Sequence, residues 1–317
     1  MGVLVSVAIV TYNQEPYIAE AIDSALSQET SFDVEIVIGD DASNDSTFDI
    51  CRGFKERYPQ KIKLIRSERN QGLVKNYGQV FNLCTGKYIA ILEGDDYWSV
   101  PWKLQKQIDI LENDSEIGLV HTDNDKLIKD GILIRSNKKK RGISPPNGYV
   151  FDSLFKRNFI ASLTVCFRKD LFEKYVDFGK FIEEDLVTID YSIWLELSFH
   201  SKIYYLDEST AVYRVLETSL TNNHDFKKIE NYFNKGRTIK KYFVDKYKPE
   251  KFDINKIDFI YDLGLLKWSI LLRDQGKALE YGNKLKLKKK SISLVLLFLK
   301  NKHLFTASTW LIYFIKG

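Results

Sequence analysis

The amino-acid sequence predicts an α/β protein with a mostly parallel β-sheet and helices on both of its faces. Two observations lead to this class. Short β-branched runs alternate with longer runs whose apolar residues recur every three or four positions, and such alternation is typical of strands joined by covering helices. The chain of 317 residues is also long enough for one large domain, or for a domain with an appendage.

Five runs in the first part of the chain have the composition of strands, because they are rich in β-branched residues and too short for helices. We expect strands at residues 5–10, 34–39, 61–66, 87–92 and 117–122. The first run is apolar but has neither a basic segment before it nor a small-residue cleavage site after it. It is therefore interpreted as a buried strand and not as a signal peptide.

Four amphipathic runs separate these strands, and we expect helices within residues 15–28, 45–58, 71–84 and 100–113. Pro16 and Pro101 stand where the first turn of a helix tolerates proline. Asp45 with Ser46 supplies capping oxygens before the second helix.

Beyond residue 122 the pattern changes. Residues 124–134 predict a polar hairpin with its turn at Asp130 and Gly131, and a basic loop follows at 135–148. Such a charge run is typical of a solvated surface, although it could also meet an anionic substrate. A strand is expected at 202–215, and helical periodicity dominates afterwards. We predict a catalytic domain at 1–222 and a C-terminal helical region at 223–317.

The bulk composition excludes some functions and favours others. A net charge of +4 gives no reason to expect binding to nucleic acid. The three cysteines, Cys51, Cys84 and Cys166, have no metal-binding spacing, so we expect reduced, buried thiols in a cytoplasmic protein. No run reaches the roughly 20 apolar residues of a membrane-spanning helix.

Polar residues follow three of the predicted strands, at the point where each strand ends. They are Thr11, Tyr12 and Asn13 after the first strand, Asp40 and Asp41 after the second, and Glu93, Asp95 and Asp96 after the fourth. Ligands of open α/β sheets bind outside the carboxyl ends of the strands, so these residues predict one anionic pocket. Each could alone be a turn residue, but carboxylates this close together resist ionisation unless a cation shares the site.

An ordered set of motifs resembles the family 2 glycosyltransferases, the inverting, nucleotide-sugar-dependent enzymes of the GT-A fold. The set covers about residues 3–220 and consists of VAIVTYNQEPYIAEAIDSALSQ, IGDDASNDST, RNQGLVKNYG, GKYIAILEGDDYW and DYSIWLEL. The resemblance implies a Rossmann-like GT-A domain that takes a sugar from a nucleotide-diphosphate donor.

The resemblance implies roles for the acidic residues after the fourth strand. Asp96 matches the metal ligand of the family, and the implied cofactor is Mn²⁺ or Mg²⁺, since both prefer carboxylate oxygen. Asp95 matches the residue that binds the ribose. Glu93 replaces the more usual aspartate at the first acidic position, so its role stays open.

The other donor-binding residues are implied in the same way. Asp41 matches the aspartate that accepts a hydrogen bond from a pyrimidine base, and Thr11 and Tyr12 match the residues that frame this base. Lys75 could approach the diphosphate from a loop that also contains Asn70, Gly72 and Asn76, although this segment equally fits a plain helix cap.

Inversion needs a general base for the acceptor hydroxyl, and Asp190 matches the base of the family. The neighbouring carboxylates Glu183, Glu184 and Asp185 compete for this role. Near the end of the last strand, Arg214 or the following His224 could contact the diphosphate or the metal, but a structural arginine and a loop histidine are the simpler interpretation.

The C-terminal run combines a basic cluster with apolar segments and two aromatic residues. The residues concerned are Lys284, Lys286, Lys288, Lys289, Lys290, Trp310 and Tyr313. This combination is typical of a segment that lies in an anionic membrane interface, and it equally fits a helical hairpin packed on residues 262–272. The first alternative predicts a cytoplasmic protein peripheral to the inner face of the plasma membrane.

The function predicted from the sequence is metal-dependent, inverting transfer of a sugar, from a UDP-sugar in preference to other donors, to a hydroxyl of a surface polysaccharide or a polyprenyl-linked glycan. A nucleotidyltransferase acting on sugar phosphates is an alternative, but it usually has a glycine-rich basic loop where this chain has TYNQEPY. A non-catalytic nucleotide-binding module would leave Asp190 unexplained, and the GxGxxG of an NAD enzyme is missing after the first strand.

Overall fold

The structure, a computed structural model, describes residues 2–136, 138, 141–184, 186, 188–216, 225–249, 252–286 and 299–300. The chain divides into two compact units. The first consists of Met1–Glu183 with Ile189–Leu216, and the second of Glu184–Thr188 with Glu217–Gly317. Each unit is described by itself below.

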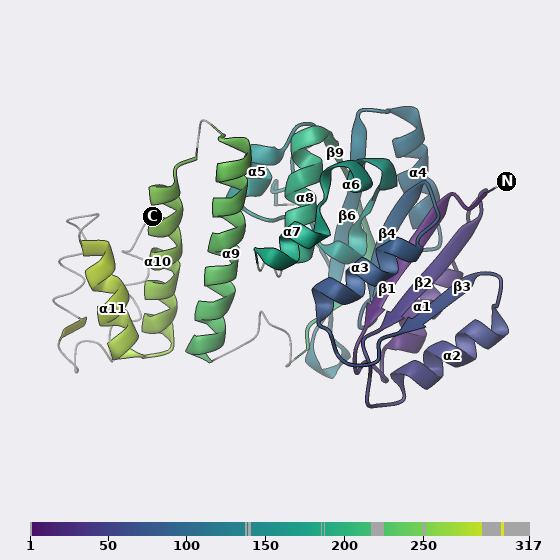
Figure 1. The fold of residues 1–317 in the computed structure, drawn as a ribbon, viewed down its shortest axis with the longest axis horizontal. Coiled ribbons are helices and arrows are strands. Elements are labelled where there is room, and N and C mark those ends of the chain that lie inside the picture. The colour runs from purple at the N-terminus through teal and green to yellow at the C-terminus, as the bar shows by residue number, and fades with distance from the viewer. Residues whose placement is uncertain are drawn as a thin grey trace. The chain divides into compact units, whose positions relative to one another are not determined.

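The first unit contains one mixed β-sheet, of which Figure 1 labels β1, β2, β3, β4, β6 and β9. The strand order is β3-β2-β1-β4-β8-β6-β9-β5, and β7 pairs with β6. The strands are β1 (Val5–Thr11), β2 (Val34–Asp40), β3 (Ile62–Arg66), β4 (Tyr88–Glu93), β5 (Tyr97–Trp98), β6 (Ile117–Leu127), β7 (Leu133–Ile134), β8 (Cys166–Arg168) and β9 (Lys202–Arg214). Strands β3, β2, β1 and β4 are parallel neighbours, and β8 runs antiparallel between β4 and β6. The predicted fold class is thus confirmed.

Eight α-helices accompany this sheet within the described part of the first unit. They are α1 (Ile18–Leu26), α2 (Thr47–Arg57), α3 (Leu73–Leu83), α4 (Lys103–Asn113), α5 (Phe151–Lys156), α6 (Lys169–Tyr175), α7 (Phe178–Glu183) and α8 (Ile189–His200), with short 3₁₀ turns η1 (Lys129–Gly131) and η2 (Ser162–Thr164). The predicted cap of α2 is half right: Asp45 accepts a hydrogen bond from the Thr47 amide at 3.0 Å, whereas the side chain of Ser46 makes no cap bond.

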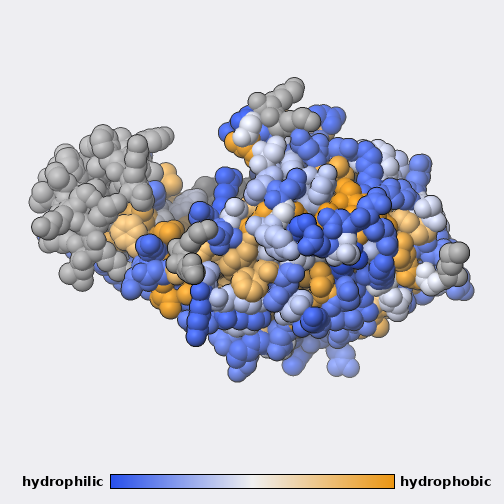
Figure 2. All heavy atoms as spheres, turned by 90° about the horizontal axis from the view of Figure 1, so that it is seen from above, coloured by the Kyte–Doolittle hydropathy of each residue, from blue (hydrophilic) through white to orange (hydrophobic). Residues whose placement is uncertain are grey.

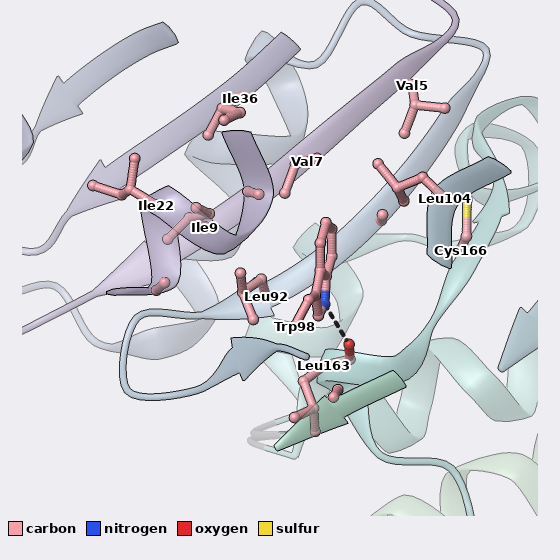
Figure 3. Packing of buried hydrophobic residues seen from close by; sticks show 14 of the residues in the cluster. Val5, Val7, Ile9, Ile22, Ile36, Leu92, Trp98, Leu104, Leu163 and Cys166 are labelled. Atoms are coloured by element: carbon pink, nitrogen blue, oxygen red, sulfur yellow. Dashed lines mark hydrogen bonds between the residues drawn. The ribbon is translucent and has the colours of Figure 1, made fainter. Parts of the chain in front are cut away.

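The apolar faces of α1, α2 and α4 pack on one side of the sheet. Their cluster includes Ile22 from α1 and Leu104 from α4, which lie against buried strand residues such as Val7. Figure 3 shows this packing, with the indole N–H of Trp98 donating to the carbonyl oxygen of Leu163 at 2.8 Å. Each fully buried side chain of this size contributes about 1.5–3 kcal/mol, so the cluster holds the carboxyl ends of the strands in place.

The opposite side of the sheet is covered by α3, α6 and α8 through aromatic contacts. Phe81 of α3 packs edge to face on Phe167 of β8, and Phe167 packs in the same manner on Trp194 of α8. Cys51, Cys84 and Cys166 are free and buried, as the sequence predicted. On the face that Figure 2 shows, hydrophobic residues reach the surface only in separate patches among hydrophilic ones.

The second unit contains the helices α9 (Phe226–Tyr247), α10 (Ile254–Leu271) and α11 (Gln275–Lys286). Asp225 and Asp253 cap α9 and α10 by accepting backbone hydrogen bonds. Leu299 is fully buried in the apolar cluster of α10 and α11, and its carbonyl oxygen accepts a hydrogen bond from Gln275 at 2.8 Å. This part of the C-terminal run therefore packs on the helices.

The membrane-anchor prediction for the C-terminal run falls mostly on residues that the structure does not describe. Lys288, Lys289, Lys290, Trp310 and Tyr313 all lie outside the described residues. Among the helices that are described, none combines the length and the hydropathy needed to cross a bilayer.

Candidate active site

The carboxyl ends of three parallel strands lie together at one edge of the sheet. In the register of β1, Val10 pairs with Glu93 of β4, and Thr11 pairs with Asp40 of β2. The polar residues that follow β1, β2 and β4 therefore meet at this edge, as the sequence predicted from their positions alone.

The acidic turn, residues Glu93–Trp98, follows β4 and leads into β5. Its backbone is tied to the end of β1, since the amide of Gly94 donates to the carbonyl oxygen of Val10 at 3.0 Å. A Cβ atom on Gly94 would lie 2.4 Å from Oε1 of Gln14 and 2.9 Å from Oγ1 of Thr11. A larger residue would therefore displace the side chains of Gln14 and Thr11, because the acidic turn passes against the loop after β1. Thr11 donates its hydroxyl hydrogen to Gln14 Oε1 at 2.7 Å.

The carboxylates of the acidic turn are buried close to one another, and their pKa values are raised. Burial, together with the charge of Asp95, raises the pKa of Glu93 to about 7. Burial also raises the pKa of Asp95 and, more strongly, that of Asp96, where the charges of Glu93 and Asp95 add to the effect. Crowded, desolvated carboxylates of this kind favour a bound cation.

Arg214, the last residue of β9, holds the acidic turn from its other side. Its backbone amide donates to Asp96 Oδ1 at 2.8 Å, and its guanidinium donates to the carbonyl oxygen of Asp95 at 2.6 Å. The same guanidinium forms an ion pair with Glu20 of α1 and lies over the ring of Tyr97 at 4.7 Å from the centroid. These contacts fit the structural interpretation of Arg214 that the sequence offered.

Asp190 is brought to the acidic turn although it lies far along the chain. It belongs to the first turn of α8, and its Oδ2 accepts a hydrogen bond from Ser162 of η2 at 3.3 Å. The charge of Asp190 contributes to the raised pKa of Glu93 and to that of Tyr77, whose hydroxyl donates to Glu93 Oε1 at 3.0 Å. Burial raises the pKa of Asp190 itself.

The side chains of this site fit a divalent cation in their chemistry. Asp95, Asp96 and Glu93 offer only carboxylate oxygens, which hard Mg²⁺ and Mn²⁺ prefer. The Oε2 atom of Glu93 is buried and has no hydrogen-bond partner. Among the described residues, no group of three or more His, Cys, Asp or Glu side chains is arranged to hold one ion, so a cation here would rely on few protein ligands and on ligand phosphates, as Mg²⁺ usually does.

The loop after β2 places Asp41 against the start of α3. The two carboxylate oxygens of Asp41 accept hydrogen bonds from the amides of Gln71 and Gly72, each at 2.8 Å. Gly72 has φ +88°, in the region that favours glycine. Thus Asp41 orders residues 70–72, whose remaining contacts are local: Asn70 Oδ1 accepts from the Gly72 amide, and the buried Asn76 donates to the Gly39 carbonyl oxygen at 2.9 Å.

The other residues predicted from the sequence to bind the donor or to act as the base differ in how exposed they are. Thr11 is buried, Tyr12 is 40% exposed, and Lys75 lies exposed in the first turn of α3. Glu183 is exposed and forms an ion pair with Lys180 at 3.0 Å, so it is not one of the side chains grouped around the acidic turn.

Two of the predicted candidates, Asp185 and His224, lie outside the described residues. The structure adds four polar residues that sequence reasoning missed, namely Gln14, Glu20, Tyr77 and Ser162. Three of them stand inside the quoted motifs. Their positions in a predicted loop or helix are typical of solvated residues as well, so only the tertiary contacts reveal them.

Comparisons of the sequence with known proteins identify a family and several relatives. The sequence profile described as Glycosyl transferase family 2 matches residues 6–174. An uncharacterized protein of Mycobacterium tuberculosis is 34% identical over 209 residues, which cover 66% of this chain and 58% of that protein. The matched region thus spans little more than half of this relative. Chondroitin synthase of Escherichia coli is 30% identical over 62% of this chain and 26% of its own length.

Solved structures share the fold at low sequence identity. TarS of S. aureus in complex with UDP-GlcNAc is 16% identical, with a TM-score of 0.59, and the match covers 96% of this chain and 88% of that one. The mannosyltransferase PcManGT of Pyrobaculum calidifontis, in complex with GDP-Man and Mn²⁺, is 16% identical, with a TM-score of 0.57, and the match covers 96% and 86%. Since the profile covers more than half of the chain, this protein belongs to glycosyl transferase family 2.

Proposed function

We propose that this chain is a metal-dependent, inverting glycosyltransferase that moves a sugar from a UDP-sugar to a hydroxyl of a surface polysaccharide or a lipid-linked glycan. The observation that carries the proposal is the position of Asp190 beside Glu93 of the acidic turn, with Ser162 as its hydrogen-bond partner. This carboxylate also accepts backbone hydrogen bonds at the start of α8, and inversion requires a base of this kind. The UDP-GlcNAc complex of TarS and the chondroitin synthase relative support the choice of donor and of acceptor class.

The proposed reaction is a single displacement. Asp190 takes the proton from the acceptor hydroxyl while the hydroxyl oxygen forms a bond to C1 of the sugar. The bond between C1 and the phosphate oxygen breaks on the opposite face, and the nucleoside diphosphate leaves with the bonding electrons. The raised pKa of Asp190 strengthens it as a proton acceptor, and the hydrogen bond from Ser162 orients the carboxylate.

The donor side of the site is assigned to residues at the other strand ends. We assign Thr11, Tyr12, Asp41, Lys75 and Asp95 to the donor, and Asp96 to Mn²⁺ or Mg²⁺. When bound, such a cation supplies positive charge that neutralises the diphosphate. Asp95 and Asp96 are held in place for this task by the contacts that Arg214 makes to the acidic turn. The Mn²⁺ complex of PcManGT supports the use of a divalent cation.

A donor screen tests the proposal. We expect the purified protein with Mn²⁺ to hydrolyse one member of a panel of UDP-, GDP- and dTDP-sugars slowly, and EDTA to abolish this hydrolysis. Asp96→Ala should remove both hydrolysis and the rise in melting temperature that UDP with Mn²⁺ produces. Asp190→Asn, which keeps the shape of the side chain, should lower kcat for transfer by about 100-fold or more and preserve the UDP effect on the melting temperature.

The exposed Glu183 offers a matched control for the base. Glu183→Gln removes an exposed neighbouring carboxylate that forms an ion pair with Lys180, and we expect its kcat to equal that of the wild type. Full activity of Asp190→Asn would refute the assignment of the base. Absence of turnover on every donor, together with no nucleotide-dependent change in melting temperature, would refute the proposed function.

A further inference from the structure

The hairpin that follows β6 carries apolar side chains that are exposed within the part of the chain that the structure describes. Ile132, Leu133 and Ile134 are consecutive in the sequence and are 56%, 38% and 48% exposed, and Ile143 is 50% exposed. Side chains on a strand alternate between its two faces, so neither face of β7 packs on the core. Three consecutive exposed aliphatic residues on an edge strand are an aggregation risk that natural proteins avoid unless a partner covers them.

The sequence around this apolar strand is rich in basic residues. Six basic residues and one acidic residue lie between positions 129 and 143. Arg135 is exposed although it pairs with Asp125 at 3.3 Å, and Arg141 is exposed next to Gly142. Exposed apolar side chains beside a surplus of cations are the combination that binds an anionic membrane interface.

The root of the hairpin is fixed to the sheet. Asp125 of β6 accepts hydrogen bonds from the Ser136 amide at 2.8 Å and from the Ser209 hydroxyl at 2.9 Å. Asp123 forms an ion pair with Lys138 at 2.6 Å. Both aspartates are nearly fully buried, so the apolar strand projects from a rigid base and its position relative to the sheet is defined.

The hairpin leaves the sheet at the same end as the candidate active site. Leu127, the last residue of β6, pairs with Arg214 of β9, and the amide of Arg214 donates to Asp96. A surface that bound the hairpin would therefore lie next to the edge of the sheet at which the acidic turn and Asp190 meet.

We propose that the docking hairpin, residues Ile132–Arg135, inserts its aliphatic side chains into the interface of an anionic bilayer and holds the catalytic edge of the sheet at the membrane surface. A bilayer satisfies both the apolar and the basic residues. A second copy of the chain fits less well, because a twofold contact would place the surplus of cations of one hairpin against that of the other. The inference does not depend on the donor, and it agrees with an acceptor that is itself lipid-linked.

A fluorescent label on the hairpin tests the proposal directly. The three native cysteines are buried, so Ile132→Cys provides one accessible thiol for a solvatochromic dye. We expect the emission to shift to the blue with vesicles of phosphatidylcholine and phosphatidylglycerol, and to stay unchanged with phosphatidylcholine alone. Ile260→Cys is the matched control, since Ile260 of α10 is 58% exposed and belongs to the second unit. Absence of a shift at position 132 would overturn the proposal, whatever the label at 260 does.

Cosedimentation of the full chain with vesicles measures how much the docking hairpin contributes to membrane binding. Ile132→Gln combined with Ile134→Gln should lower the partition coefficient onto anionic vesicles about tenfold, which is about 1.4 kcal/mol, whereas Ile260→Gln should leave it unchanged. High salt should weaken the binding of the wild type. An unchanged partition coefficient of the double variant would contradict the inference. A concentration-dependent dimer that the double variant loses would show that the hairpin binds a second copy of the chain and not a membrane. An equal dye shift with dextran sulfate would show that it binds a soluble polyanion.

The two proposals fail separately. Hydrolysis of a soluble nucleotide sugar requires no vesicles, and the double variant should retain it. Vesicle binding without hydrolysis of any donor would contradict the proposed function alone, and hydrolysis without a dye shift would contradict the docking hairpin alone.

Discussion

The buried lysine of α4 leads to a prediction that can be worked out from the structure. Lys103 is fully buried; its ammonium group donates to Gln107 Oε1 at 2.8 Å and lies over the ring of Trp98 at 4.2 Å from the centroid. Gln107 in turn donates to the carbonyl oxygen of Thr164 in η2. Lys103 therefore lies beneath the turn that presents Ser162 to Asp190. Burial lowers the pKa of Lys103 from 10.5 to about 7.

The sign of the effect follows from proton binding. Between pH 7 and 10.5 the unfolded chain holds a proton on Lys103 that the folded chain has lost, so the free energy of unfolding rises with pH by about 1.4 kcal/mol per pH unit. At pH 7 and below, the penalty for the buried charge is about 5 kcal/mol. Lys103→Met removes it but leaves Gln107 without its donor, at a cost of about 2 kcal/mol, so we expect a net gain of about 3 kcal/mol.

Urea unfolding of both proteins at several pH values measures this difference. The variant should be the more stable protein at pH 6, and its advantage should fall by about 1.4 kcal/mol per pH unit above pH 7, disappear near about pH 9 and be reversed by about pH 10. Lys106→Met is the matched control on the same helix, because Lys106 is partly exposed and paired with Glu208 at 2.8 Å; we expect it to change stability by less than about 1 kcal/mol at any pH. A stability difference for Lys103→Met that did not vary with pH would refute the reasoning.

Three further substitutions test other features. Gly94→Ala would place a Cβ atom 2.4 Å from Gln14 Oε1 and 2.9 Å from Thr11 Oγ1, so we expect it to break the hydrogen bond between these side chains and to raise KM for the donor about tenfold at an unchanged circular dichroism spectrum. An unchanged KM would contradict a role of this contact in donor binding. Arg214→Lys keeps the charge but loses the contacts of the guanidinium with Glu20 and with the acidic turn, and calorimetry should find about tenfold weaker UDP binding. Unchanged UDP affinity would show that the hydrogen bond from the Arg214 amide to Asp96 alone holds the acidic turn. Arg273→Gly relieves a φ of +58° after α10 and should stabilise the chain by about 1 kcal/mol, visible as a rise in melting temperature and disproved by a fall.

The sequence predicted the elements whose signals are local. The β-branched runs of β1, β2 and β4 and the polar residues at their ends are enough to bring Thr11, Asp41 and Asp96 to one edge, because parallel neighbours end at the same side of a sheet. These are also the residues for which a family resemblance supplied roles.

The remaining features depend on contacts between distant segments. Strand β8 has only three residues, Cys166–Arg168, and is defined by its antiparallel pairing with β4 and β6. The two residues of β5 form a strand only by pairing with β9. Ser162 belongs to a 3₁₀ turn that no sequence motif marks, and only its hydrogen bond to Asp190 shows its place in the site. Glu20 has the sequence context of an ordinary surface residue of a helix, and only its ion pair with Arg214 distinguishes it. Patterns of short range cannot reveal such partners.

The hydrogen bond between Trp98 and the carbonyl oxygen of Leu163 has a thermodynamic consequence. Trp98 ends the acidic turn, and Leu163 follows Ser162, the partner of Asp190. If the donor binds at the acidic turn and the acceptor at Asp190, as we propose, a change in the acidic turn on donor binding would reach the carboxylate through this one buried bond. Such a link makes the two binding free energies depend on each other, and the dependence is reciprocal: whatever donor binding contributes to the affinity for the acceptor, acceptor binding returns to the affinity for the donor.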